Sequence, residues 1–177
     1  IGILNNINLP KIGFFPGSTI GNFSPKNAKN LLEKFKNILG KNNFLIVGVD
    51  LKKDIRILEK AYNDSEGVTA KFNKNILNCI NYIFGSKFKE SNFEHRAFFN
   101  TKKDRIEMHL VSKKSHCVDI LDDKVCLVEG ESIHTENSYK YSIKDFKQLC
   151  LNVGFEIKKT FTDNESFFGI FLLKIKY

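Results

Sequence analysis

The sequence predicts an α/β fold with a doubly wound sheet at its centre. An apolar run at residues 11–16 ends in a Pro-Gly pair, which is typical of a buried strand that opens into a loop. A second apolar run, at residues 44–49, ends in an aspartate and indicates a central parallel strand. Between them, apolar residues recur at helical spacing over residues 25–39. A strand, helix and strand of these lengths imply a right-handed crossover.

The rest of the chain completes this sheet and adds a second set of elements. Two helices are expected at residues 52–62 and 69–84, separated by a polar turn. Period-two patterns then predict an antiparallel sheet from four segments, namely 93–100, 105–112, 116–121 and 124–128. Ser142 is expected to cap a helix that ends at Gly154. Two closing strands, over residues 155–162 and 167–175, would form the antiparallel edge of the first sheet.

The composition favours a globular protein and excludes several classes of site. Hydrophobic residues make up 42% of the chain and include 17 Phe, which is enough for a core. No apolar segment reaches the ~18–20 residues of a membrane span, so we expect no membrane partner and a cytoplasmic location. The four cysteines and four histidines are scattered and lack metal-site spacing. We therefore predict no metal and four free thiols that behave as small hydrophobic residues. Cys79 and Cys150 lie on apolar helical faces and are expected in the core.

A formal net charge of +8 raises the possibility of nucleic-acid binding. Only three of the basic residues are Arg, the residue preferred for bidentate phosphate contacts, and the Lys are interleaved with Asn, Asp and Glu. A solvated surface explains this pattern better, so no nucleic-acid partner is predicted. A non-enzymatic basic binding module remains the alternative from another class of function.

Five motifs occur in an order that resembles one enzyme family. They are FFPGSTIGNFSP (14–25), GVDLKKD (48–54), AYNDSEGVTAKFNKN (61–75), RIEMHL (105–110) and EGESIHTENSYKY (129–141). In this order they resemble the C-terminal part of the S-adenosylmethionine-dependent methyltransferases that trimethylate the α-amino group of histidine. Those enzymes form hercynine in ergothioneine biosynthesis. The resemblance covers nearly the whole chain.

The resemblance implies a fold and a division of the chain. Residues 11–62 and 142–177 would form the C-terminal part of a Rossmann-like class I methyltransferase sheet. Residues 63–141 would form an inserted α+β substrate lobe, with the chemistry between the two parts. The glycine-rich loop and acidic residue that bind the cofactor in this class are absent here. We therefore expect the main S-adenosylmethionine site upstream of Ile1, on an N-terminal remainder of the same protein, and an inactive isolated fragment.

The resemblance also assigns roles in the first loop. Asn22 would hold the α-carboxylate of the substrate, since its amide both donates and accepts. The alternative is that Asn22 caps the helix that begins near Pro25. Gly17 and Ser18 would line the wall that faces the methyl donor, although Gly17 is equally explained as a turn glycine.

Glu136 and Ser138 match the imidazole-binding T-E-x-S of the family residue for residue. Two residues apart in an extended segment, they would project from the same face. The carboxylate would accept from one imidazole N–H, and the hydroxyl would meet the other nitrogen. Taken alone, a Glu and a Ser in a polar segment are usually surface residues.

Three more residues complete the expected substrate site. By resemblance, Thr69 acts at the carboxylate side, the ring of Phe72 lies near the methylated nitrogen, and Met108 lines the pocket. The alternatives are a helix cap for Thr69, a core aromatic for Phe72 and core filling for Met108.

Methyl transfer from a sulfonium requires only a neutral amine aligned in line with the S–CH₃ bond. No residue here is an obvious general base, so no catalytic residue is assigned. The predicted function is methylation of the α-amino group of histidine by a monomeric enzyme. A methyltransferase acting on another amino acid or amine is the nearest alternative.

Overall fold

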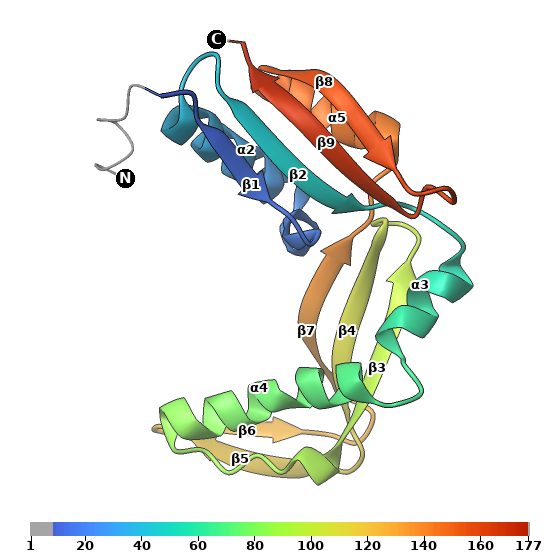
Figure 1. The fold of residues 1–177 in the computed structure, drawn as a ribbon. Helices are drawn as coiled ribbons and strands as arrows, with labels where there is room; N and C mark the ends of the chain where they lie inside the picture. The colour runs from blue at the N-terminus through green and yellow to red at the C-terminus, as the bar shows by residue number, and fades with distance from the viewer. Residues whose placement is uncertain (1–8, 177) are drawn as a thin grey trace. The chain divides into compact units, whose positions relative to one another are not determined.

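The computed structural model describes residues 9–176 (Figure 1). Its elements, in chain order, are β1 (Ile12–Phe15), the 3-10 helix η1 (Thr19–Asn22), α2 (Pro25–Leu39), β2 (Phe44–Asp50), α3 (Ile55–Tyr62), α4 (Val68–Phe84), the 3-10 helix η2 (Glu90–Asn92), β3 (Phe93–Asn100), β4 (Arg105–Ser112), β5 (His116–Ile120), β6 (Asp123–Leu127), β7 (Ser132–Tyr139), α5 (Ile143–Val153), β8 (Phe155–Thr162) and β9 (Phe168–Ile175). None of the helices within residues 9–176 is both long and apolar enough to cross a bilayer.

The chain divides into two compact units. Unit 1 runs to Lys53 and adds Lys102–Arg105 and the segment from Ser138 onward. Unit 2 contains Asp54–Thr101 and Ile106–Asn137. These borders assign α3 to unit 2 and the end of β7 to unit 1, whereas the sequence-based division was drawn at residues 62/63 and 141/142.

Unit 1 is an α/β layer with the strand order β1-β2-β9-β8 (Figure 1). β1 pairs with β2 in parallel, with Ile12 opposite Phe44. β9 pairs antiparallel with both β2 and β8. The predicted parallel pair and the antiparallel closing strands are therefore confirmed.

The helix α2 begins and ends where the sequence indicates. The Ser24 hydroxyl accepts a hydrogen bond from the Asn27 N–H at 3.3 Å, and Pro25 occupies the first turn. Gly40 ends the helix at φ 80°, a conformation that side chains with a Cβ disfavour. One face of α2 is fully buried at Ala28 and Leu32, which attaches the helix to the sheet.

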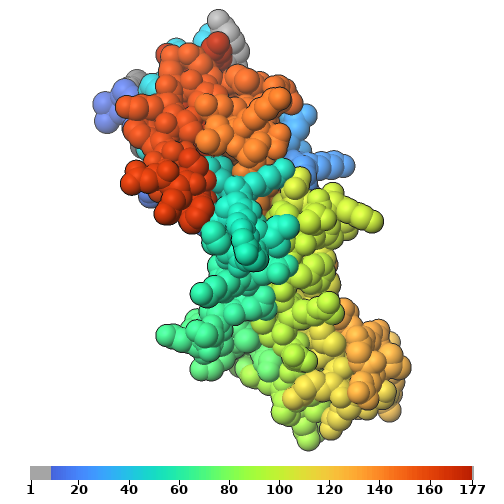
Figure 2. Space-filling view, turned by 90° about the vertical axis from the view of Figure 1, so that its right-hand side faces the viewer, coloured from blue at the N-terminus to red at the C-terminus, as the bar shows by residue number. Residues whose placement is uncertain are grey.

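α5 covers the same core of unit 1. Ser142 caps it by accepting the Asp145 N–H at 3.0 Å, as predicted, and Gly154 closes it at φ 94°. The ring of Phe146 on α5 lies 4.7 Å from the ring of Phe171 on β9, measured between centroids. In the space-filling view, α5, β8 and β9 (orange to red) form one closely packed surface (Figure 2).

The prediction that the first strand is buried is wrong. Ile12 and Phe14 are 63% and 70% exposed, respectively. The physical reason is the alternation of side chains along β1, in which Gly13 and Phe15 face α2 and Ile12 and Phe14 therefore point to the opposite face of the sheet. The doubly wound arrangement stays a prediction.

Unit 2 has two small sheets instead of the single antiparallel sheet predicted. β3, β4 and β7 form a three-stranded sheet in that order, and β5 pairs with β6 in a separate two-stranded sheet. The reason is that β4 takes β7 as its second partner, a strand distant in sequence. Leu77 from α4 and Leu58 from α3 each anchor an apolar cluster of this unit.

The cysteines also differ from expectation. Cys117 and Cys126 lie opposite each other on β5 and β6 and form a disulfide, so the prediction of four free thiols is wrong. The strand pairing of the hairpin brings these two residues together. Cys79 is exposed, although it was expected in the core. Cys150 is buried as predicted, and burial raises the pKa of its thiol to about 12.

Candidate functional site

The loop after β1 is held against the end of β2. Gly17 and Ser18 both adopt left-handed backbone conformations, with φ of 72° and 57°. The Ser18 hydroxyl accepts a hydrogen bond from the Asp50 N–H at 2.8 Å, and the Gly21 N–H donates to the Ser18 carbonyl at 2.8 Å. These bonds fix a tight loop, in which Ser18 supports the backbone of its neighbouring strand.

Asn22 is the last residue of η1 and is exposed. The alternative role as a helix cap belongs to Ser24 in the structure. Within residues 9–176, no hydrogen-bond partner occupies the Asn22 amide. This side chain can therefore donate to a ligand carboxylate without breaking an internal bond.

Gly21 brings this loop against the end of β7. A Cβ atom added at Gly21 would lie 2.8 Å from the Tyr139 carbonyl oxygen and 3.5 Å from Ser138 Oγ. Since the nearer atom belongs to the backbone, a larger residue here would displace one of the two segments. The structure thus places Ser138 beside the loop that ends in Asn22.

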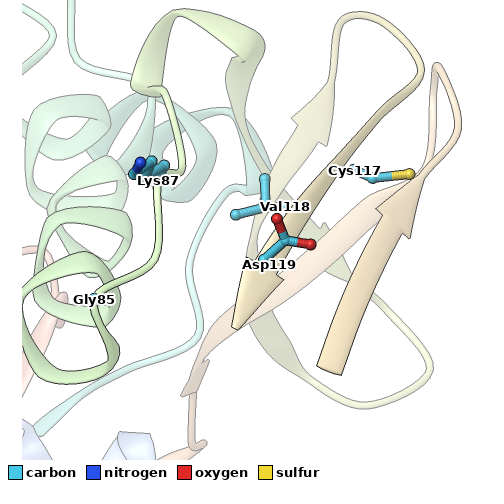
Figure 3. Close-up of a pocket in the computed structure, with 5 residues that line it drawn as sticks. All are labelled: Gly85, Lys87, Cys117, Val118 and Asp119. Carbon is cyan, nitrogen blue, oxygen red and sulfur yellow. The ribbon is translucent and has the colours of Figure 1, made fainter. Parts of the chain in front are cut away.

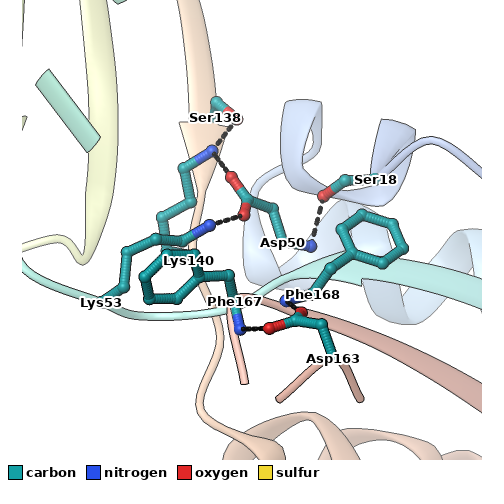
Figure 4. Close-up of polar contacts among 8 residues, drawn as sticks. All are labelled: Ser18, Asp50, Lys53, Ser138, Lys140, Asp163, Phe167 and Phe168. Carbon is teal, nitrogen blue, oxygen red and sulfur yellow. Dashed lines mark hydrogen bonds and ion pairs between the residues drawn. The ribbon is translucent and has the colours of Figure 1, made fainter. Parts of the chain in front are cut away.

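A buried ion pair lies next to Ser138 (Figure 4). Lys140 Nζ donates to Asp50 Oδ2 at 2.6 Å and to Ser138 Oγ at 2.9 Å. The Lys140 side chain is 1% exposed. A buried ammonium requires such partners, since its desolvation is costly without them. Sequence reasoning missed Lys140 and Asp50, although a Lys two residues after Ser138 in an extended segment was the available signal.

A second lysine shares the same carboxylate. Lys53 Nζ lies 2.6 Å from Asp50 Oδ1 and 5.0 Å from the centroid of the Phe167 ring. The Asp163 carboxylate accepts the Phe167 and Phe168 N–H groups and holds this ring in place (Figure 4). Two ammonium groups thus face one carboxylate, and the surplus positive charge favours an anion near this end of β2.

In unit 2, Phe72 and Glu136 line one cavity of about 240 Å³. Phe72 is 67% exposed, which is unlike a core aromatic. Glu136 is half-buried on β7. The remaining lining residues are Asn73, Asn75, Ile76, Cys79 and Thr135. An aromatic ring and a carboxylate on one small cavity can bind a planar group that carries an N–H donor.

Thr69 and Met108 are engaged elsewhere in unit 2. The backbone N–H of Thr69 donates to Asp64 Oδ1 at 2.8 Å. The hydrogen bond from the Thr69 side chain, together with those from nearby backbone N–H groups, lowers the pKa of the Asp64 carboxyl to about 2. Met108 is 3% exposed and packs in the cluster of Leu58 and Ile106. Their expected substrate contacts stay predictions.

A cavity of about 390 Å³ lies apart from these residues (Figure 3). Gly85 and Lys87, after the end of α4, line one side, and Cys117, Val118 and Asp119 of β5 line the other. It contains one acidic and one basic side chain and none of the predicted site residues. We assign it no role.

The comparisons with known proteins agree on one family. A family model described as histidine-specific, S-adenosylmethionine-dependent methyltransferase matches residues 3–175. The histidine N-alpha-methyltransferase of Mycolicibacterium smegmatis is 34% identical over 170 residues, covering 93% of this chain and 53% of that protein.

Two fungal proteins are also similar. Ergothioneine biosynthesis protein 1 of Neurospora crassa is 29% identical, over 95% of this chain and 19% of that protein. N-methyltransferase imqF of Aspergillus flavus is 27% identical, over 86% of this chain and 42% of that protein. The chain spans about half the length of the bacterial relative and less of the two fungal ones.

Proposed function

Since the chain belongs to the histidine-specific, S-adenosylmethionine-dependent methyltransferase family, we propose that it forms part of an enzyme that methylates the α-amino nitrogen of histidine. The observation that carries this proposal is the placement of Ser138 beside the loop that ends in Asn22. These residues, far apart in sequence, are the ones that would contact the two ends of one amino acid.

The carboxylate end of histidine would bind near Asn22. Its exposed amide donates hydrogen bonds, and Lys53 and Lys140 add positive charge around Asp50 in the same unit. A charged hydrogen bond contributes about 1.5–3 kcal/mol. These groups would orient the α-amino nitrogen without reacting with it.

The imidazole end would be read by Ser138 and Glu136. A hydroxyl has one hydrogen to donate and two lone pairs. Lys140 Nζ donates to Ser138 Oγ and would hold this side chain in place. The Ser138 hydroxyl would meet the unprotonated imidazole nitrogen, while Glu136 would accept the N–H of the other.

The methyl donor would approach along Gly17 and Ser18. A Cβ added at Gly17 would meet nothing within 4 Å, so the loop has open space on this side, which fits a bulky ligand. S-adenosylmethionine supplies the electrophilic methyl group, and the residues of this chain hold the acceptor amine in position. The principal contacts to S-adenosylmethionine would come from a segment that corresponds to the half of the bacterial relative not matched by this chain.

The edge of β1 favours an N-terminal partner segment. One side of β1 lacks a paired strand within the described sheet, and one face of the strand exposes the large apolar side chains of Ile12 and Phe14. Such an edge is a template for further strands. We propose that the remainder of the protein extends the sheet here, that unit 2 corresponds to an inserted substrate lobe, and that the enzyme acts as a cytoplasmic monomer.

The natural protein that contains this chain should convert histidine to Nα-methylated products when supplied with S-adenosylmethionine, as measured by mass spectrometry. The similarity to an N-methyltransferase of a different name favours one alternative, a methyltransferase of another amino acid or amine. Faster methylation of a non-histidine amino acid would establish that alternative. No methylation of any amino acid or amine would contradict both.

A further inference from the structure

We propose that Glu107, His109 and His134 bind a divalent transition-metal ion, for which zinc is the probe. Their ligand atoms all lie within 4.8 Å of one another. Glu107 and His109 stand two residues apart on β4, and His134 lies on the adjacent strand β7. The cysteine and histidine spacing predicted no metal site, because these residues come together only through the pairing of β4 with β7.

The spacing of the first two ligands fits one tetrahedral ion. Glu107 Oε2 and His109 Nε2 are 3.3 Å apart. Two ligands at the usual zinc distances of about 2.0–2.2 Å, set at a tetrahedral angle, are separated by roughly 3.3–3.5 Å. A backbone movement is therefore not needed for these two atoms to share an ion.

His134 supplies the third ligand after a change of side-chain torsion. Its ring stacks on His109, with centroids 4.5 Å apart and planes 11° from parallel. Nitrogens in parallel rings do not aim at one point, so one ring must turn. His134 is exposed, and exposed side chains change rotamer within nanoseconds.

The first two ligands already have the supporting contacts that orient metal ligands. Asn100 Nδ2 donates to Glu107 Oε1 at 3.0 Å, and Glu107 Oε2 faces His109 Nε2. Ser132 Oγ lies 3.3 Å from His109 Nδ1, which leaves Nε2. Outer contacts of this kind fix the orientation of the ligand and the tautomer of a metal-binding histidine.

His134 makes a hydrogen bond that its turn toward the ion would break. Its Nε2 lies 3.1 Å from the backbone carbonyl oxygen of Glu136, and the metal bond would replace this contact. An ion held by β4 and β7 would cross-link these strands two residues from Glu136. We infer a stabilising role for the ion, independent of the proposed methyl transfer.

The ligand set selects the class of metal. Two imidazole nitrogens and one carboxylate suit zinc and its neighbours among the transition metals, whereas magnesium and calcium prefer all-oxygen sites. Three protein ligands leave a fourth position for water.

Calorimetric titration of the untagged natural protein with zinc chloride tests the site. A Cys79→Ser background removes the exposed free thiol, which would compete for zinc. We expect one zinc ion per chain. His134→Ala should weaken binding by more than about 100-fold, and Ser132→Ala, which removes only an outer contact, by about 10-fold.

His116→Ala is the matched control, since His116 lies on β5 outside the cluster, and it should bind zinc as the background protein does. Because His134 is exposed, its variant should keep the melting temperature of the metal-free protein. Absence of stoichiometric zinc binding, or equal affinity in His134→Ala, would overturn the proposal.

Discussion

Lys140 Nζ lies 2.6 Å from Asp50 Oδ2, although the two residues are 90 positions apart in the chain. Asp50 ends β2, and Lys140 directly follows β7. The ion pair therefore joins the end of the sheet in unit 1 to the segment that carries Ser138. The side chain of Lys140 is 1% exposed and that of Asp50 is 22% exposed, so the pair is screened by solvent only from the Asp50 side.

Lys140→Met should lower both stability and histidine turnover. Removing one partner of a buried pair costs ~3–5 kcal/mol when the other charge is left alone. Asp50 keeps Lys53 and partial solvent contact, so we expect a loss of about 2 kcal/mol in the free energy of unfolding. Urea denaturation measures this loss, and steady-state kinetics should show a raised KM for histidine.

Lys53→Met is the control for this prediction, because it removes the other ammonium on Asp50 and leaves Lys140 Nζ on Ser138 Oγ. It should cost less stability than Lys140→Met. Equal losses from the two variants would contradict a specific role for Lys140 in orienting Ser138.

Gly21→Ala should disturb the site by a direct clash. The new methyl group would lie 2.8 Å from the Tyr139 carbonyl oxygen, and overpacking of this kind costs about 1–3 kcal/mol. Gly67→Ala provides a comparison, since a Cβ there meets nothing within 4 Å, and the substitution costs only the strain of a φ of 67°. Thermal unfolding should show the larger loss for Gly21→Ala, together with weaker histidine binding. A smaller loss than that of Gly67→Ala would contradict the contact.

The first sheet could be predicted in most of its detail, because its signals are local. Ser142 and Gly154 mark the ends of their helix through their own capping chemistry, whereas α2 is capped by Ser24 and not by Asn22, the cap considered from the sequence. The separate hairpin of β5 and β6 was missed because the sequence does not show that β4 prefers β7 as a partner. Strand pairing between distant segments depends on tertiary packing, which a single sequence does not reveal.

The same limit applies to the candidate site. The loop at Asn22 could be located because glycines and small polar residues follow an apolar run. Lys140 was missed because a lysine in a polar segment is ordinarily solvated. Its spacing from Ser138 indicates only a shared face, and its burial depends on Asp50 from a distant strand. The assignment of Glu136 and Ser138 to the site depended on the resemblance to the family. Their spacing indicated only that the two side chains lie on the same face.

The 177-residue chain should bind S-adenosylmethionine poorly, and the natural protein that contains it should bind well. The reason is that this chain matches about half of the bacterial relative, and we propose that the principal contacts to the methyl donor lie in the counterpart of the other half. Calorimetry on both proteins measures the difference. Equally tight binding by the 177 residues alone would show that the main cofactor site lies within them.

The net charge of +8 should not produce specific nucleic-acid binding. Affinity for single-stranded RNA at physiological salt should stay in the non-specific range, ~10⁻⁴ to 10⁻⁶ M. Fluorescence anisotropy with several RNA sequences tests this. Sequence-selective binding at nanomolar concentration would favour the basic binding module over the enzyme.

Asn22→Ala should weaken the methylation of every amino acid that the natural protein accepts. The amide would contact the α-carboxylate, which all amino acids share, and a charged hydrogen bond contributes about 1.5–3 kcal/mol. Assays with a panel of amino acids measure this. A loss confined to histidine would contradict the assignment of Asn22 to the carboxylate.

The central claim is tested most directly by the methylation rates of histidine and a panel of amino acids, measured with the natural protein and with Glu136→Ala. Wild type should prefer histidine. Glu136→Ala should lower the histidine rate by about one to two orders of magnitude, because a lost charged hydrogen bond of about 1.5–3 kcal/mol corresponds to that factor. Binding of S-adenosylmethionine should be unchanged. A wild-type preference for another substrate, or a histidine rate that Glu136→Ala leaves intact, would contradict the account.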